Sequence, residues 1–358
     1  MNSDENDIAV VRAENVTPGE SPDLERIDKM NICVVGLGSI SKRHIKNIRG
    51  LYPDADIDIL RHGKNGASES SEYGRELYAP EDLKDHYDAV FITNPTTMHV
   101  RTLRDLIDKS DAFFIEKPLR PILHDDDRVI NGVAESAGDR ADDPVTKGII
   151  EDKINIERFP ENKIFYVACP MRYTNIVKWL KENIDTEKVL SIRAMSSSYL
   201  PEWRPGTDYS KCYSARRELG GGVATDLIHE WDYISYLFGR PEVIHSVERK
   251  LSSLDADVED IAVYIGEYKD KIAEVHLDYF GRSVRRELEL FMTDDTVICD
   301  FVTNKITYLK SGVTKSFDEE RDDYQTAELK HFFDIAGGNV PNDSSASEAE
   351  ALLELIEN

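Results

Sequence analysis

The stretch from Asn31 to Ser41 most constrains the fold of this 358-residue chain. Ile32–Val35 is a short apolar run, which is typical of a strand buried on both faces. Gly36 and Gly38 follow at once, and residues 39–49 carry apolar side chains at helical spacing. A strand, a tight glycine turn and a helix N-terminus form a site for a pyrophosphate. The backbone can approach the phosphates there, and the helix dipole favours their negative charge.

The third position of this glycine motif holds Ser41, so the motif reads Gly-x-Gly-x-x-Ser. The same pattern alone also fits an ordinary strand-to-helix turn, and its context decides between the two interpretations. The residues expected to contact a dinucleotide here are Gly36, Gly38, Ser39 and Ile40.

Composition sets limits on the class of protein. A hydrophobic content of 40% and a charged content of 32% are those of a water-soluble globular protein. No apolar run approaches the ~20 residues that span a bilayer, and the N-terminus lacks a signal-peptide pattern. The four cysteines are scattered, which indicates neither a disulfide framework nor a metal site. We therefore expect a reduced, cytoplasmic protein. The net charge of −25 argues against a nucleic-acid partner.

The sequence pattern changes once along the chain, at about residue 170. From Met30 to Cys169, strand-like and helical runs alternate, which predicts a parallel sheet that binds ligands at the carboxyl ends of its strands. Beyond Met171, closely spaced strand-like runs predict a largely antiparallel, open sheet with helices on one face. The predicted α/β chain has a flexible acidic tail (1–29), a dinucleotide-binding domain (30–169) and an α+β domain for substrate binding and oligomerisation (170–358).

The individual elements follow from the same periodicities. In the first domain we expect strands at 32–35, 56–61, 89–93, 112–116 and 164–168, helices at 39–49, 98–109 and 129–137, and an exposed insertion around 138–144. In the second we expect strands at 189–195, 243–249, 261–268, 272–280, 286–292 and 296–301, and helices at 176–183, 225–237 and 324–335.

The end of the second strand bears on the choice of dinucleotide. An acidic residue there would accept a hydrogen bond from a ribose 2′-hydroxyl, whereas a cation suits a 2′-phosphate. This strand ends in Arg61 and His62. The sequence favours NADP(H) without excluding NAD(H), and a solvated basic turn is the alternative interpretation.

Two further loops follow strands of the expected sheet. Asn94, Pro95, Thr96 and His99 come after the strand at 89–93, where Pro95 would turn the chain away and polar groups would face the cofactor. An ordinary loop before a helix is the alternative.

Glu116 and Lys117 end the next strand, so Glu116 is expected beside the same cofactor. A lysine near a nicotinamide can hold a carbinol oxygen and move its proton, because desolvation lowers its pKa towards neutrality.

Four motifs occur in order: Val34–Ser41, Thr93–His99, Glu116–Pro118 and Gly220–Asp232. Together they resemble the glucose–fructose oxidoreductase/inositol dehydrogenase/MocA (Gfo/Idh/MocA) family over roughly residues 30–356. The resemblance implies a Rossmann domain followed by an α/β domain whose sheet often forms the oligomer interface. It also implies oxidation or reduction of a sugar or cyclitol carbon with NAD(P), and it identifies Lys117 with the family's catalytic lysine.

The fourth motif leads into a helix that carries Asp226, His229 and Asp232. Positions three apart share a helix face, so these side chains can point into one cleft. The family's aspartate lies four residues before its histidine, whereas here the separation is three. Asp226 matches by its distance from the glycines, while Thr225 matches by its distance from His229. His229 is therefore the better-supported assistant of the lysine, and a solvated polar helix face is the alternative.

The loop at 199–209 precedes this helix and is rich in proline and aromatic residues. Trp203 and Tyr209 suit stacking on a sugar, and Arg204 suits bidentate binding of a carboxylate or phosphate. A proline-rich lid without a ligand is the alternative. The expected substrate-binding residues are these three, Asp232, and Arg172 and Tyr173, which match a family position that lines the cleft.

The resemblance thus implies an NAD(P)-dependent oxidoreductase that acts on a CH–OH carbon of a sugar, a cyclitol, or a nucleotide-linked or acidic sugar. Its catalytic residues would be Lys117, His229 and Asp226, with no metal. A glycoside hydrolase with tightly bound NAD and a non-catalytic dinucleotide sensor are the alternatives. The expected partners are a small-molecule sugar and further copies of the chain, as a dimer or tetramer, and neither nucleic acid nor membrane.

Overall fold

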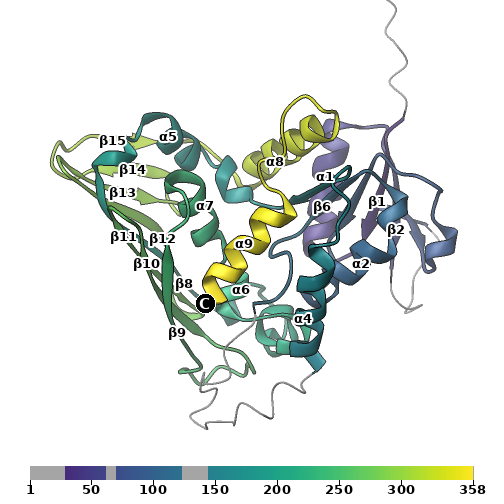
Figure 1. Ribbon diagram of the computed structural model, residues 1–358, viewed down its shortest axis with the longest axis horizontal. Coiled ribbons are helices and arrows are strands. Elements are labelled where there is room, and N and C mark those ends of the chain that lie inside the picture. Colours follow the sequence, from purple (N-terminus) through teal and green to yellow (C-terminus); the bar gives the residue numbers. More distant parts are fainter. Residues whose placement is uncertain (1–28, 62–69, 123–143, 358) are drawn as a thin grey trace, which may run out of the picture.

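The computed structural model describes residues 29–61, 70–122 and 144–357. The acidic tail, His62 and the helix expected at 129–137 fall outside these ranges, apart from residue 29 of the tail. The described chain forms two sheets with helices between and around them (Figure 1). None of its helices is both long and apolar enough to cross a membrane.

The first sheet has seven strands in the order β3-β4-β2-β1-β5-β6-β7. All neighbouring pairs are parallel except β3 with β4, as expected for a Rossmann fold. The five strands predicted for this domain are confirmed. They are buried apart from the first residue of β1, β2 and β7, because both faces of the sheet are covered. The strands are β1 (Asn31–Val35), β2 (Asp56–Leu60), β3 (Ser70–Ser71), β4 (Gly74–Leu77), β5 (Ala89–Ile92), β6 (Ala112–Ile115) and β7 (Ile164–Val167).

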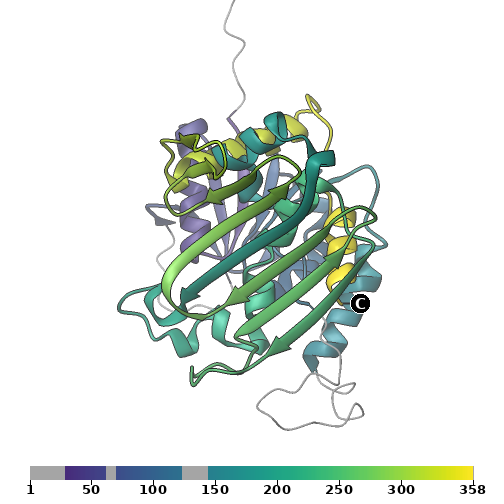
Figure 2. The same ribbon diagram turned by 90° about the vertical axis from the view of Figure 1, so that its left-hand side faces the viewer.

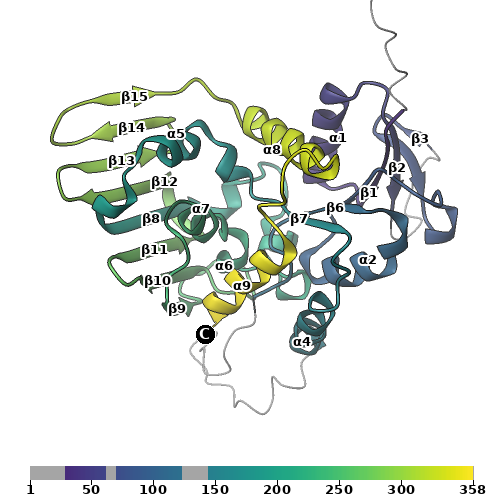
Figure 3. The ribbon, with the colours of Figure 1, turned by 45° about the horizontal axis from the view of Figure 1, so that its top comes forward.

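Helices from both ends of the chain cover this sheet (Figure 3). They are α1 (Ser39–Leu51), α2 (His99–Asp105), α4 (Pro144–Ile156), α8 (Arg321–Ala336) and α9 (Ala346–Glu357). Helix α2 is shorter than the expected 98–109, because 3₁₀ turns at Thr96–Met98 and Ile107–Lys109 flank it. The sequence pattern does not predict α4 or α9.

Helix α8 returns the chain to the first sheet from far along the sequence. The ring of Phe332 packs edge-on against Phe91 of β5 and Phe114 of β6, with centroids 5.6 and 5.3 Å apart. The residues of one face of α8 are buried in the same cluster as β1. Residues 321–336 therefore stabilise the dinucleotide-binding sheet rather than the second sheet.

The second sheet has eight strands in the order β15-β14-β13-β12-β8-β11-β10-β9. It is antiparallel except for the parallel pair β8 and β11, so the expected largely antiparallel sheet is confirmed. Figure 2 shows that one face carries no helix. The strands are β8 (Val189–Tyr199), β9 (Val243–Arg249), β10 (Ile261–Glu267), β11 (Ile272–Asp278), β12 (Phe280–Met292), β13 (Thr296–Asp300), β14 (Lys305–Tyr308) and β15 (Thr314–Ser316), of which the last two were not predicted.

Three helices, α5 (Asn175–Asn183), α6 (Val223–Asp226) and α7 (His229–Phe238), lie on the other face of the second sheet. The prediction of one helix over 225–237 is wrong, because the helix breaks between α6 and α7. Leu227 leaves the helical region at φ −103° and ψ 28°, and the N–H of Glu230 donates to Leu227 instead of Asp226. The carbonyl of Asp226 is thereby released for another partner.

Candidate active site

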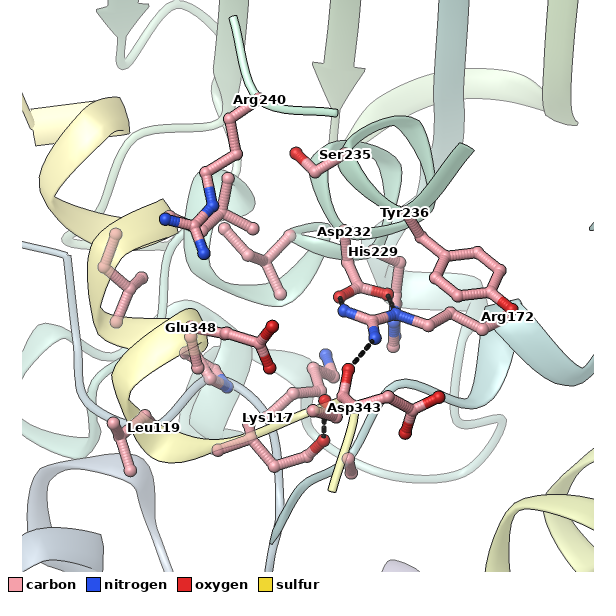
Figure 4. Close-up of a pocket in the computed structure, with 18 of the residues that line it drawn as sticks. Lys117, Leu119, Arg172, His229, Asp232, Ser235, Tyr236, Arg240, Asp343 and Glu348 are labelled. Carbon is pink, nitrogen blue, oxygen red and sulfur yellow. Dashed lines mark hydrogen bonds and ion pairs between the residues drawn. The ribbon is translucent and has the colours of Figure 1, made fainter. Parts of the chain in front are cut away.

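A cavity of about 460 Å³ lies between the first sheet and the helices next to it. Its walls are α7 and α9, and its floor is formed by the carboxyl ends of β6 and β7 and the segments that follow them (Figure 4). Lys117 comes from the end of β6, and His229 is the first residue of α7. The structure thus brings into one cavity two residues that are 112 positions apart in the sequence.

The side-chain nitrogen of Lys117 donates to the main-chain carbonyl of Asp226 at 2.6 Å and lies 3.9 Å from its carboxylate. The break between α6 and α7 leaves this carbonyl free to accept. Burial lowers the pKa of Lys117, and the nearby charges of Asp226 and Glu116 oppose that change. A lysine with a lowered pKa loses its proton at a lower pH than an ordinary lysine, so its neutral amine can accept a proton and return it.

The carboxylate of Asp226 is buried and accepts a hydrogen bond from Tyr279. Tyr279 donates its hydroxyl to Oδ2 at 2.9 Å, and burial together with this carboxylate raises the pKa of Tyr279 well above its ordinary value. The tyrosine therefore stays protonated as a donor. Asp226 is fixed beside Lys117 as a counter-ion, although the sequence spacing left its position open.

No hydrogen-bond partner for the His229 ring occurs within the described residues. Burial lowers the pKa of His229 well below its ordinary value, and the positive charges of Lys117, Arg286 and Arg321 act in the same direction. The imidazole is therefore neutral at physiological pH. A neutral, unpartnered ring that lines the cavity can bind a substrate hydroxyl.

Glu116 has a partner that the sequence analysis missed. Oε1 of Glu116 lies 2.5 Å from Nε2 of His44, a buried residue of α1. Burial would raise the pKa of Glu116, but the hydrogen bond and charge of His44 outweigh it, and the pKa falls below its ordinary value. The available signal was the position of His44, which shares the buried face of α1 with Ile45 and Ile48.

The glycine turn can accommodate a diphosphate. Gly36 has φ +94°, a conformation that favours glycine, and Gly38 is exposed with no atom near the place that a Cβ would fill. No described group accepts from the N–H groups of Ser39 and Ile40 at the start of α1, so these donors remain free.

Ser41 fits the third motif position through hydrogen bonds. Its buried hydroxyl accepts from the N–H of Gly38 at 3.1 Å and lies 2.8 Å from Oγ1 of Thr93. Thr93 in turn donates to the carbonyl of Val35, so Ser41 is the donor to Thr93. The serine therefore links α1, through Thr93, to the end of β1 and to the residue after β5. A glycine at this position would let the helix pack close to the strands but could not form these hydrogen bonds.

The loop after β5 contains one buried hydrogen-bond acceptor without a partner among the described residues. Asn94 donates to Thr102 at 2.8 Å, but its buried Oδ1 has no partner within the described residues. His99 is fully buried between the carbonyls of Asn94 and Pro118, at 2.9 and 3.0 Å, and ties this loop to the one after β6. His99 therefore holds the two loops together, and both of its ring nitrogens already have main-chain partners.

Thr96, in the same loop, is buried, and its hydroxyl lies 3.2 Å from that of Tyr213 in the second domain. Pro95 precedes it and ends the extended segment at φ −56°. This contact joins the loop after β5 to the segment before α6.

Arg61 follows β2 as expected, but its charge is already compensated. Its guanidinium donates to Glu76 of β4 at 2.6 Å, and this hydrogen bond raises the pKa of Arg61 and lowers that of Glu76. A 2′-phosphate would have to compete with Glu76 for this guanidinium.

The predicted substrate residues fall into two groups. Arg172 and Asp232 line the cavity and form a bidentate pair, with nitrogen–oxygen distances of 3.1 and 2.6 Å. Tyr173, Trp203, Arg204 and Tyr209 do not line it. Trp203 donates to Ser198, Tyr209 accepts from the N–H of Asp255, and Arg204 is exposed.

The cavity also contains polar residues that sequence reasoning missed. They are Ser235, Tyr236, Arg240, Asp343, Ser344 and Glu348. Ser235 and Tyr236 continue the face of α7 that starts at His229, so helical spacing was an available signal. No group of three or more His, Cys, Asp or Glu within the described ranges could hold a metal ion.

Comparison with known proteins identifies the first domain. Residues 30–138 match the model of the Gfo/Idh/MocA family, described as an oxidoreductase family with an NAD-binding Rossmann fold. No curated protein sequence matches the chain.

Solved structures match almost the whole chain. UDP-N-acetylglucosamine 3-dehydrogenase GnnA from Acidithiobacillus ferrooxidans is 17% identical, with a TM-score of 0.67 over 91% of this chain and 95% of that one. WlbA dehydrogenase from Bordetella pertussis, solved with NADH and UDP-GlcNAcA, is 17% identical, with a TM-score of 0.66 over 92% and 94%. At these identities the likeness concerns the fold. The family match thus identifies residues 30–138 as an NAD-binding Rossmann domain of the Gfo/Idh/MocA oxidoreductase type, and the solved structures extend the likeness in fold to the rest of the chain.

Proposed function

We propose that this protein is an NAD(P)-dependent oxidoreductase that interconverts an alcohol and a carbonyl on a sugar, a cyclitol, or a nucleotide-linked or acidic sugar. The observation that carries the proposal is the presence of Lys117 and His229 in one cavity at the carboxyl edge of a dinucleotide-binding sheet. The similarity in fold to sugar dehydrogenases supports the choice of a sugar.

In the direction of oxidation, Lys117 accepts the proton of the substrate hydroxyl on its side-chain nitrogen. Its lowered pKa provides the neutral amine, and the carbonyl and carboxylate of Asp226 stabilise the ammonium that forms. His229, neutral and unpartnered within the described chain, donates to or accepts from the same or a neighbouring hydroxyl. A bound nicotinamide dinucleotide supplies the hydride acceptor.

The residues that would hold the dinucleotide are Gly36, Gly38, the N–H groups of Ser39 and Ile40, and Asn94. The cationic end of β2 supports binding of NADP(H), whereas the ion pair of Arg61 with Glu76 weakens that preference. We therefore propose that the site accepts both NAD(H) and NADP(H), with Glu76 limiting the affinity for the phosphorylated form.

The surroundings of the site support two further proposals. Cys33, Cys169, Cys212 and Cys299 are all free thiols, which is typical of a reducing compartment such as the cytoplasm. One face of the second sheet carries no helix (Figure 2). Its strands expose apolar side chains, including Val243, Val247, Ile265 and Ile272, which supports a homo-oligomer formed through this sheet.

A spectrophotometric assay tests the activity. The purified protein is incubated with NAD⁺ or NADP⁺ and a panel of sugars, cyclitols, sugar acids and nucleotide sugars, and reduced nicotinamide is followed at its absorbance band. Reduction that depends on one sugar class supports the proposal. Release of product at an unchanged oxidation level would instead identify a hydrolase, and dinucleotide binding without turnover of any substrate would identify a sensor.

A further inference from the structure

The cavity is longer than one sugar ring. The residues of α7 and its C-terminal loop that line it are His229, Asp232, Ser235, Tyr236, Gly239 and Arg240, so it follows the whole helix. Helix α7 has 10 residues, which corresponds to a length of ~15 Å. A six-membered ring with bonds of about 1.5 Å measures roughly 3 Å across, and about 6 Å with its hydroxyl oxygens. A single sugar held at Lys117 and His229 would therefore leave the far end of the cavity unfilled.

Arg240 stands at this far end. It is exposed, and no hydrogen bond or ion pair joins its guanidinium to any other described residue. Figure 4 shows its side chain extending from the loop after α7 along α9. The backbone before it is fixed, because the N–H of Gly239 donates to Ser235 and its carbonyl accepts from Tyr268. The backbone turn that carries Arg240 is thus fixed, and its guanidinium remains available.

The other charges in the cavity have partners. The guanidinium of Arg172 is held by Asp232, whose two oxygens it contacts. Glu348 accepts from the N–H of Ser345 at 3.0 Å and caps α9, and Asp343 lies 2.9 Å from His331. Neither acid forms an ion pair with Arg240 within the described chain. An anion that binds Arg240 would therefore not have to displace a carboxylate of the described chain.

A second polar group lies along the path to Arg240. Ser235 lines the cavity, and its buried hydroxyl has no partner among the described residues. A buried hydroxyl without a hydrogen bond is unfavourable, and a ligand oxygen would satisfy it. Ser235 and Arg240 together provide two donors that oxygen-rich ligand groups could use beyond the reacting ring.

We propose that the substrate carries an anionic group remote from its reacting carbon, and that Arg240 binds this group as the determinant of substrate specificity. The planar guanidinium offers paired donors that match the oxygens of a phosphate or carboxylate. The inference rests on the proposed function, since it assumes that the reacting sugar lies at Lys117 and His229. Two sources fit the chemistry: the diphosphate of a nucleotide-linked sugar, or the carboxylate of a second sugar unit.

Calorimetric titration of the full-length protein separates these sources. The probes are UDP, which has the diphosphate of a nucleotide sugar but lacks the sugar linked to it, and cellobiouronic acid, whose anion is a carboxylate on a disaccharide. We expect at least one probe to bind the unmodified protein, and R240Q to weaken that binding roughly 10- to 100-fold. R240K, which keeps the charge and loses the fork, should fall between the two. Arg101→Gln on α2 removes an exposed cation outside the cavity and is the matched control.

Each outcome decides the question. Loss of UDP binding in R240Q supports the diphosphate, and loss of disaccharide binding supports the carboxylate. Binding of both probes that is insensitive to Arg240, or binding of neither, overturns the inference. A parallel NADH titration by fluorescence distinguishes failure of this inference from failure of the proposed function. If NADH binds while no probe depends on Arg240, only this inference fails, whereas a protein that binds neither NADH nor NADPH contradicts the proposed function itself.

Discussion

The side-chain nitrogen of Lys117 donates a hydrogen bond to the main-chain carbonyl of Asp226, 109 residues further along the chain, at 2.6 Å. This bond joins the end of strand β6 to the break between α6 and α7, and so connects the two domains at the cavity. The carboxylate of Asp226 lies 3.9 Å from the same nitrogen, so it adds negative charge beside Lys117 but forms no hydrogen bond with it. The backbone and side chain of one residue therefore have separable effects on the lysine.

This separation predicts the behaviour of Asp226→Asn. The main-chain carbonyl remains, so Lys117 stays in place, but the negative charge that raises the pKa of Lys117 is lost. The ascending limb of the pH profile of kcat/KM for oxidation should lie below the ordinary lysine pKa of 10.5 in the unmodified protein and move to still lower pH in the variant. A shift to higher pH would contradict the role of Asp226 as counter-ion.

Glu76→Gln should change cofactor preference. Removing the carboxylate frees the guanidinium of Arg61, which is then available for a 2′-phosphate. We expect the Kd for NADPH to fall by about tenfold while that for NADH changes little, because one new charge-assisted hydrogen bond contributes roughly 1.5–3 kcal/mol at most. Fluorescence titration with both nucleotides measures this. Equal changes in the two affinities would show that Arg61 does not face the 2′ position.

The wall formed by α9 depends on a buried ion cluster. Arg120, which is fully buried just after β6, donates to Glu350 and Glu357 of α9. Arg120→Met would leave two carboxylates without this partner, and we expect the free energy of unfolding to fall by about 3–5 kcal/mol. Urea denaturation measures the loss, with the exposed Arg101→Met as control, for which a change within ~0.5 kcal/mol is expected. Equal stability of the two variants would show that α9 is held by other contacts.

The sequence was most informative about elements with strong local patterns. The central strands of the first sheet are short apolar runs because both faces are buried, and β1, β5 and β6 could be predicted almost to the residue. The shared edge of parallel strands placed Lys117 near the expected cofactor. His229 was brought to the same site by the family resemblance, since it lies on a helix of the second sheet rather than at a strand end.

Features that depend on distant partners could not be predicted in this way. The helix breaks after Asp226 where its carbonyl accepts from Lys117, and nothing local to residues 225–237 marks that point. The pairing of Glu116 with His44 spans 72 residues, and that of Arg61 with Glu76 requires β4 to lie beside β2. Arg240 follows an ordinary Gly239 turn, and only the position of α9 across the cavity makes it a candidate ligand.

The role of Lys117 is tested by hydride transfer in Lys117→Met, measured in single turnover with saturating cofactor and a substrate found in the panel. The substitution keeps the length of the side chain and removes the nitrogen that accepts the proton. We predict that the rate falls by about 10²- to 10⁴-fold, while the Kd for the dinucleotide stays within a factor of about three, because the free donors of the glycine turn are unchanged. Transfer at the unmodified rate in this variant would contradict the assignment of Lys117 as the proton acceptor.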